Sequence, residues 1–69
     1  MKYLVVVEKA QNNFSAYVPD LPGCVATGAT VEEAEKCIRA AITMHLEGLR
    51  QDGLPIPEPQ AQAALVDAS

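Results

Sequence analysis

The 69-residue chain is long enough for one domain and is acidic, because nine acidic residues outnumber five basic ones and leave a net charge of −4. Proteins that bind nucleic acid need clustered lysine and arginine to neutralise phosphates, so this composition argues against direct contact with DNA or RNA. Two cysteines and one histidine are too few for a disulfide framework or a zinc site, and no apolar run reaches the ~18 residues that would cross a membrane.

These limits predict a cytoplasmic protein with no cofactor and no membrane association. A domain of this length buries only about 60 % of the surface that its unfolded chain exposes, so small domains often need further support. Because neither a disulfide nor a metal is available to stabilise the fold, we expect the chain to form a homodimer or a homotetramer.

Residues 2–8 form the first predicted strand. Both of its faces are largely apolar, with Tyr3, Val5 and Val7 on one and Leu4, Val6 and Glu8 on the other. This pattern is typical of a strand at the centre of a sheet, or of one that is covered on both sides. The polar residues 9–13 that follow are typical of a hairpin connection.

Residues 14–18 form the second predicted strand, which ends at Pro19 because proline cannot donate a hydrogen bond to a ladder. The next stretch, Leu21-Pro22-Gly23-Cys24, predicts a type II turn. Proline presets φ at the second position of such a turn, and glycine accepts the positive φ of the third. Residues 25–28 then return as a third strand, so the three strands form an antiparallel meander.

Thr30 begins one long predicted helix. Thr30-Val31-Glu32-Glu33 is a capping box, in which the threonine hydroxyl accepts from the Glu33 amide while the Glu33 carboxylate reaches back. Gly53 is placed to end the helix as a C′ glycine, and Pro55 prevents its continuation. Gly48 inside the helix costs about 1 kcal/mol relative to alanine, which suggests a close contact there.

Apolar residues recur at helical spacing and form one stripe, so we expect the helix to lay a single face on the sheet. The stripe consists of Val31, Ala34, Ile38, Ala41, Ile42, His45, Leu46 and Leu49.

Prolines at positions 55, 57 and 59 predict an extended, semi-rigid segment that carries the chain back across the domain. Residues 64–67 could then add a short fourth strand beside the meander. The sequence therefore predicts an α+β fold of order β-β-β-α-β, a three-stranded meander packed on one long helix, in a single domain over residues 1–69. We expect structural roles for Gly23, Thr30, Glu33, Gly53 and Pro55.

Candidate chemical groups are few, and each has a structural interpretation. His45 lies in the apolar stripe and is interpreted as a core or interface histidine. Cys24 and Cys37 are interpreted as small buried hydrophobic residues. Asp20 lies between two prolines and is a single carboxylate, whereas metal-dependent nucleases and glycosidases need at least two. We therefore expect Asp20 to accept hydrogen bonds from the amides of its turn. No catalytic residue and no metal ligand is predicted.

Three stretches resemble the HicB-type antitoxin family: FSAYVPDLPGC at residues 14–24, GATVEEA at residues 28–34 and GLPIPEP at residues 53–59. The resemblance covers roughly residues 3–60 and implies a truncated ribonuclease H-like fold. Longer members of the family continue into a C-terminal DNA-binding segment. This chain resembles a short stand-alone form, for which we expect no C-terminal DNA-binding domain.

The resemblance also implies a function. Members of the family are bacterial antitoxins of type II toxin–antitoxin systems that bind a small basic HicA-type toxin, which cleaves mRNA, and hold it inactive by covering its active surface. No catalytic residue carries over, because an antitoxin is an inhibitor. We expect the partner to contact Tyr17, Asp20, Leu21 and Pro22. The acidic composition suits a basic partner, although moderate negative charge also serves solubility alone.

Two other functions remain open. The chain could be a stand-alone oligomeric interaction domain with a different partner, in which residues 13–18 or the C-terminal strand offer an edge to another chain. It could also be a diverged ribonuclease H-like nuclease. That alternative needs a second carboxylate beside Asp20, and the sequence provides no evident candidate.

Overall fold

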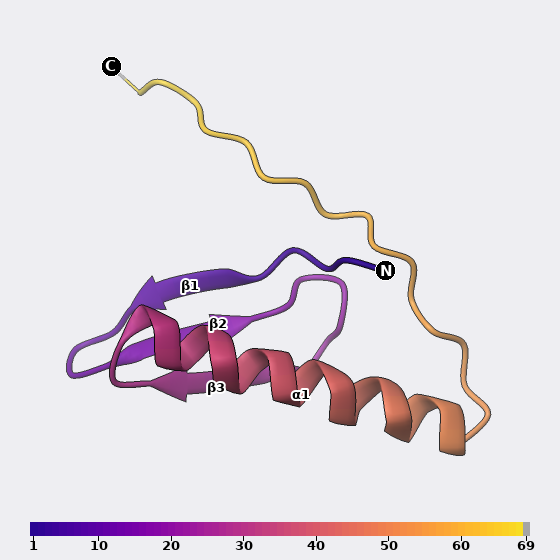
Figure 1. Ribbon diagram of the computed structural model, residues 1–69. Coiled ribbons are helices and arrows are strands. Elements are labelled where there is room, and N and C mark those ends of the chain that lie inside the picture. The colour runs from indigo at the N-terminus through magenta and orange to yellow at the C-terminus, as the bar shows by residue number, and fades with distance from the viewer. Residues whose placement is uncertain (69) are drawn as a thin grey trace.

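Three antiparallel strands and one helix make up the regular structure of residues 1–68, which the computed structural model describes (Figure 1). Strands β1 (Val6–Lys9), β2 (Phe14–Tyr17) and β3 (Val25–Gly28) precede helix α1 (Val31–Gln51). The sheet has the order β1-β2-β3, so β2 is central, and α1 lies along one face of the sheet. The predicted α+β arrangement of a meander and one long helix is confirmed.

The register of the sheet separates an inner face, toward α1, from an outer face. Ala16 in β2 is paired with Val7 in β1 and with Ala26 in β3, and all three belong to the core or pack against it. One residue further along, Tyr17 is paired with Val6 and with Val25. Because neighbouring residues of a strand point to opposite faces, Val6, Tyr17 and Val25 form a row across the outer face.

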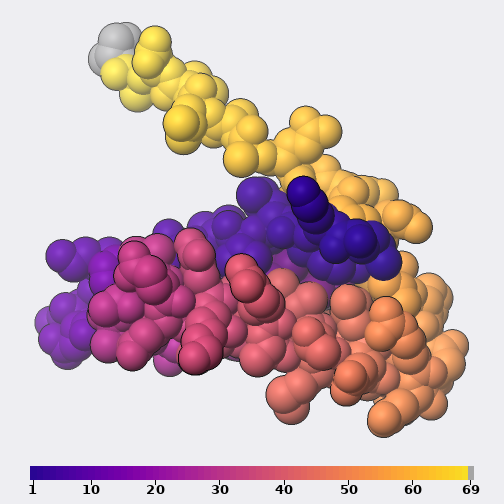
Figure 2. All heavy atoms as spheres, viewed as in Figure 1, coloured from indigo at the N-terminus to yellow at the C-terminus, as the bar shows by residue number. Residues whose placement is uncertain are grey.

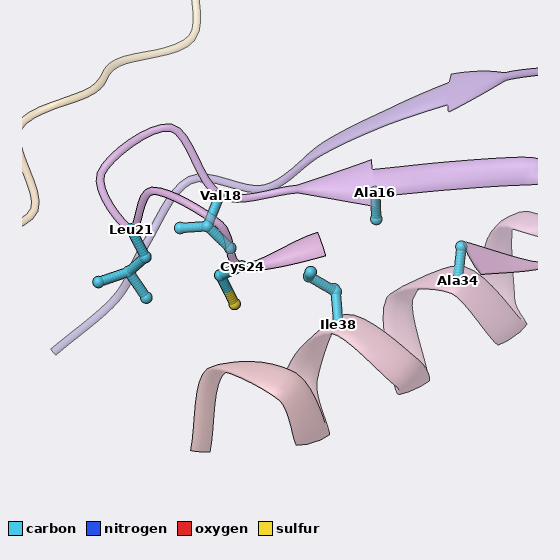
Figure 3. Close-up of a cluster of buried hydrophobic side chains, with 6 residues drawn as sticks. All are labelled: Ala16, Val18, Leu21, Cys24, Ala34 and Ile38. Atoms are coloured by element: carbon cyan, nitrogen blue, oxygen red, sulfur yellow. The ribbon is translucent and has the colours of Figure 1, made fainter. Parts of the chain in front are cut away.

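A small core joins the helix to the sheet (Figure 3). Leu21 and Ile38 are its largest fully buried side chains, and Ala16 and Ala34 are small enough to let the two backbones approach. The buried residues are Ala16, Val18, Leu21, Cys24, Ala34 and Ile38.

Gly28, at the end of β3, lies at the closest approach between sheet and helix. A Cβ atom added to Gly28 would overlap the backbone of Glu33 and Ala34 in the first turn of α1. Gly48 has open space around it, so the close contact suggested for that residue is wrong. The position where glycine is needed for packing is therefore in the strand and not in the helix.

The loop between β2 and β3 folds inward through two consecutive turns. The Cys24 amide donates to the Leu21 carbonyl at 3.1 Å, and Gly23 has φ of +82°, which confirms the type II turn. The Leu21 amide itself donates to the Val18 carbonyl at 3.0 Å. The two turns share Leu21, whose side chain points into the core (Figure 3).

The N-terminus of α1 is capped as predicted. Thr30 Oγ1 accepts from the Glu33 amide at 3.1 Å. The Glu33 carboxylate accepts in turn from the amide of Ala29 at 2.8 Å, one residue before the cap. Two amides that the helix itself cannot satisfy are thereby paired.

The C-terminus of α1 ends at the predicted glycine. Gly53 has φ of +69°, and its amide donates to the Arg50 carbonyl at 3.1 Å. The Leu54 amide donates to the Leu49 carbonyl at 2.9 Å. These two bonds form a Schellman motif, which requires the left-handed conformation that glycine adopts without strain.

Helix α1 is longer than the sheet that it covers. Its 21 residues span about 31 Å, whereas each strand has four residues. Ala34 and Ile38 are therefore buried, while Ala41, Ile42 and Leu46 further along the stripe are only half-buried. In Figure 1 the last turns of α1 run past the end of the sheet.

Strand β1 differs from its prediction in both length and position. It spans four residues, Val6–Lys9, instead of residues 2–8, and it lies at the edge of the sheet. The apolar pattern of residues 3–7 on both faces predicted a central or fully covered strand, and for the single chain this prediction is wrong. No strand within residues 1–68 pairs with the outer edge of β1.

Residues 54–68 follow α1 without forming a helix or a strand. The Tyr3 hydroxyl donates to the Pro57 carbonyl at 2.6 Å, and Asp20 Oδ2 accepts from the amides of Gln60 and Ala61, each at 3.0 Å. We call these three hydrogen bonds the clamp. They hold the proline-rich segment against the N-terminal residues and the β2–β3 loop, in agreement with the predicted return across the domain.

Residues 62–68, which we call the arm, extend beyond the clamp. All of them are exposed, and none belongs to a strand. Figures 1 and 2 show the arm leaving the body of the molecule. The fourth strand expected at residues 64–67 is therefore not formed beside the meander in the described chain.

Replacement of Gly28 by alanine is expected to lower the free energy of unfolding by about 2 kcal/mol, because the added methyl group overlaps the first turn of α1. Gly48→Ala is the matched control, since it adds the same atom in open space and should raise the free energy of unfolding by about 1 kcal/mol. Urea denaturation of both variants measures the two changes. Similar effects at the two positions would contradict the close approach at Gly28.

Replacement of Asp20 by alanine is expected to open the clamp. Hydrogen exchange of the Gln60 and Ala61 amides, followed by NMR, should become about 10-fold faster, because a hydrogen bond to a carboxylate contributes roughly 1.5 kcal/mol or more. Glu58→Ala removes one negative charge from the proline-rich segment, where no hydrogen bond of the clamp depends on it, and should leave both rates unchanged. Equal acceleration in the two variants would show that charge, and not the clamp, protects these amides.

Candidate functional site

A groove runs between β1 and α1. The helix packs mainly on β3 and β2 and contacts β1 much less, so the inner side of the N-terminal strand is left partly uncovered. The groove has a volume of about 410 Å³. Its lining residues are Lys2, Tyr3, Val5 and Val7 from the N-terminal segment and Glu35, Ile38, Arg39 and Ile42 from the helix.

The groove combines an apolar floor with a charged rim. Valines and isoleucines form the floor, and Lys2, Glu35 and Arg39 stand at the rim. Two of the five basic residues of this acidic chain therefore lie at one groove. Such a groove fits an apolar segment that carries a negative charge.

The outer face of the sheet is a second open surface. The row of Val6, Tyr17 and Val25 lies on the side that α1 does not cover. Tyr17 is 39 % exposed and Val25 is 65 % exposed. A shallow hollow on β2 and β3 includes Ser15 and Thr27 beside them. An exposed apolar row with an aromatic residue at its centre is typical of a surface that binds a protein.

The structure separates the four residues that were predicted to contact a partner. Tyr17 and Pro22 are exposed. Leu21 is 0 % exposed, so its side chain offers no surface and instead supports the loop from inside the core. Asp20 is half-buried and accepts from two amides 40 and 41 residues further along the chain, instead of from the amides of its own turn.

The nucleophilic and titratable candidates are not gathered into one site. Cys24 is buried, as predicted, and burial raises the pKa of its thiol, which keeps it protonated and a poor nucleophile at neutral pH. Cys37 is exposed on α1, so its predicted burial is wrong. His45 is half-buried on α1. Within residues 1–68, no group of three histidine, cysteine, aspartate or glutamate side chains is arranged to hold a metal ion.

The sequence did not predict the groove, although the apolar pattern of the first strand was a sign of it. The apolar alternation of residues 3–7 indicated that β1 needs cover on both faces. The charged residues at the rim carried no signal, because only the packing of α1 brings Glu35 and Arg39 beside Lys2. No helix in the described part of the chain combines the length and apolarity that a bilayer crossing requires.

Comparison with known proteins assigns this arrangement to a family. The family described as HicB_like antitoxin of bacterial toxin-antitoxin system matches residues 3–69. A UPF0150 protein of Thermoplasma acidophilum is 36% identical over 69 residues, which cover 99% of this chain and 100% of that protein.

Other relatives agree with this assignment. A 14.9 kDa protein from the rep-hol intergenic region of Haemophilus phage HP1 is 36% identical over 58 residues, and the match covers 84% of this chain but only 44% of the phage protein. A solved structure titled as a HicA3 and HicB3 toxin-antitoxin complex contains a chain that is 32% identical, with a TM-score of 0.73 over 87% of this chain and 70% of that chain. On both sequence and fold, the chain belongs to the HicB-like antitoxin family of bacterial toxin–antitoxin systems.

Proposed function

We propose that this protein is the antitoxin of a type II pair, and that it binds a small basic HicA-type toxin in the cytoplasm and blocks the surface with which the toxin cleaves mRNA. The observation that supports the proposal most is the likeness to a chain of the HicA3–HicB3 complex, in both fold and sequence. The role is inhibitory, so it requires a complementary surface and no catalytic group.

The distribution of charge supports a basic partner. Every acidic residue except the half-buried Asp20 is exposed, so most of the net charge of −4 is carried on the surface. A ribonuclease must present positive charge to the phosphates of RNA. An acidic protein that covers such a surface is steered to it and competes with the RNA there.

The outer face of the sheet is the surface that we assign to the toxin. Its central residue, Tyr17, is flanked by Val6 and Val25 across the strands, and no part of α1 covers it. Exposed aromatic residues with apolar neighbours contribute most of the binding energy in many interfaces. Pro22 is exposed on the loop that follows β2 and is a second contact candidate.

A nuclease activity of the chain itself has less support. A metal-dependent nuclease needs two or more carboxylates around its ion. Within residues 1–68 no group of three or more histidine, cysteine, aspartate or glutamate side chains is arranged around a common point, and Asp20 is occupied by the amides of Gln60 and Ala61. RNA cleavage by the purified chain in magnesium or manganese, abolished by Asp20→Asn, would support the enzyme instead.

Co-expression with the small basic protein encoded beside its gene tests the proposal. The two proteins should copurify, and added chain should suppress RNA cleavage by the partner at equimolar amounts. If no neighbouring gene encodes such a protein and none copurifies from cells, the antitoxin role is contradicted.

Tyr17→Ala tests the assigned surface. Loss of this aromatic contact should raise the Kd for the toxin about 10-fold or more, measured by calorimetry. Met44→Ala is the matched control, because Met44 is 72% exposed but lies on the helix. Circular dichroism of both variants confirms that they fold. A Kd that rises with Met44→Ala and not with Tyr17→Ala would place the toxin on the helix.

A further inference from the structure

The arm is an extended apolar segment with nothing covering it. Leu65 is fully exposed, and Val66 is 85% exposed. None of the backbone or side-chain hydrogen bonds found in the described chain involves residues 62–68. Fixing a segment in one extended conformation costs conformational entropy, which favourable contacts normally offset. In this single chain, no contact does so.

Strand β1 has an unpaired edge that could accept such a segment. Its outer edge has no partner strand, which leaves a row of backbone amides and carbonyls unpaired. Tyr3, Val5 and Val7 pack against the core on the inner face, whereas Leu4 and Val6 lie on the other face. A strand that is apolar on both faces is typical of the interior of a sheet. One added strand would move β1 from the edge to the interior.

The arm matches this edge in length and in pattern. Residues 62–68 are seven residues, as are residues 3–9, and in extended form each spans about 23 Å. Leu65 and Val66 are adjacent, so in a strand one enters the groove while the other continues the outer apolar face. Strand addition by main-chain hydrogen bonds, with side chains in alternate pockets, is a common binding mode.

The charges match as well. Asp67 is the one charged residue of the arm. The groove that runs beside β1 has Lys2 and Arg39 at its rim, against one carboxylate, Glu35. An arm that lays Leu65 into the groove places Asp67 on the same side, because residues two apart share a face. The carboxylate of the arm and the basic rim therefore attract each other.

The clamp fixes the point at which the arm leaves its own chain. Hydrogen bonds at Pro57, Gln60 and Ala61 hold the base of the arm, and from there it leaves its own body (Figures 1 and 2). We propose that the arm of each chain pairs with the β1 edge of a second copy, laying Leu65 into that copy's groove. Two chains related by a two-fold axis exchange arms reciprocally and form a closed dimer.

Light scattering of the purified chain, without any toxin, tests the dimer. The expected mass is 14.6 kDa, twice the 7.3 kDa of one chain. Leu65→Asp should raise the dimer dissociation constant about 10-fold or more, because a charge replaces the side chain that fills the groove. Met44→Asp, at an exposed apolar position on α1, should leave it unchanged. A monomeric wild type, or equal effects of the two substitutions, would overturn the proposal.

Crosslinking distinguishes an exchanged arm from one that closes on its own chain. In a Cys37→Ser background, Val6→Cys and Val66→Cys place thiols on the β1 edge and on the arm, while Cys24 stays buried. A short bifunctional maleimide should join two chains, and the Val66→Cys chain without Val6→Cys should not be joined. A covalent link within one chain, or no link at all, would overturn the exchange. Because no toxin is present, failure here leaves the antitoxin proposal standing.

Discussion

The close approach between the first turns of α1 and the β2–β3 hairpin determines where every other element can lie. Small residues make it possible: Ala16 and Ala34 face each other, and Gly28 has no side chain to separate the strand from the helix. Leu21 and Ile38 then fill the space beyond. Because the helix is drawn toward β3 and β2, it cannot also cover β1, and the groove is the direct consequence of this packing.

The same packing explains why so much apolar surface stays open. With a core of six buried residues, the fold has little apolar area with which to offset its conformational entropy. The half-buried end of the helix stripe, the outer row of the sheet and the arm all remain available for other chains. Surfaces of this kind belong to proteins that are completed by a partner, and an antitoxin is such a protein.

The two open surfaces have different chemistry, so they suit different partners. The groove has a basic rim and lies beside an unpaired strand edge, which suits an extended segment with a negative charge. The outer sheet face is flat and apolar around Tyr17, in a molecule whose exposed charge is mostly negative. The assembly that we propose uses the groove between copies, so it leaves the sheet face and the acidic surface open for the basic toxin that we propose as partner.

Local sequence determined the features whose causes lie within a few residues of each other. The type II turn at Gly23, the capping box at Thr30 and the Schellman motif at Gly53 each depend on the φ preference or hydrogen bonds of neighbouring residues, so the sequence alone predicted them. The order of three strands and one long helix followed from periodicity in the same way.

Only the tertiary structure decided the features whose causes lie far apart along the chain. It placed β1 at an edge, exposed Cys37, buried Leu21, and brought Asp20 to amides 40 residues away. It also left the arm unpaired, although residues 64–67 have the composition of a strand. Periodicity shows that a segment has an apolar face, but which element meets that face depends on how the helix packs on the sheet, and this packing is set by contacts between residues far apart along the chain.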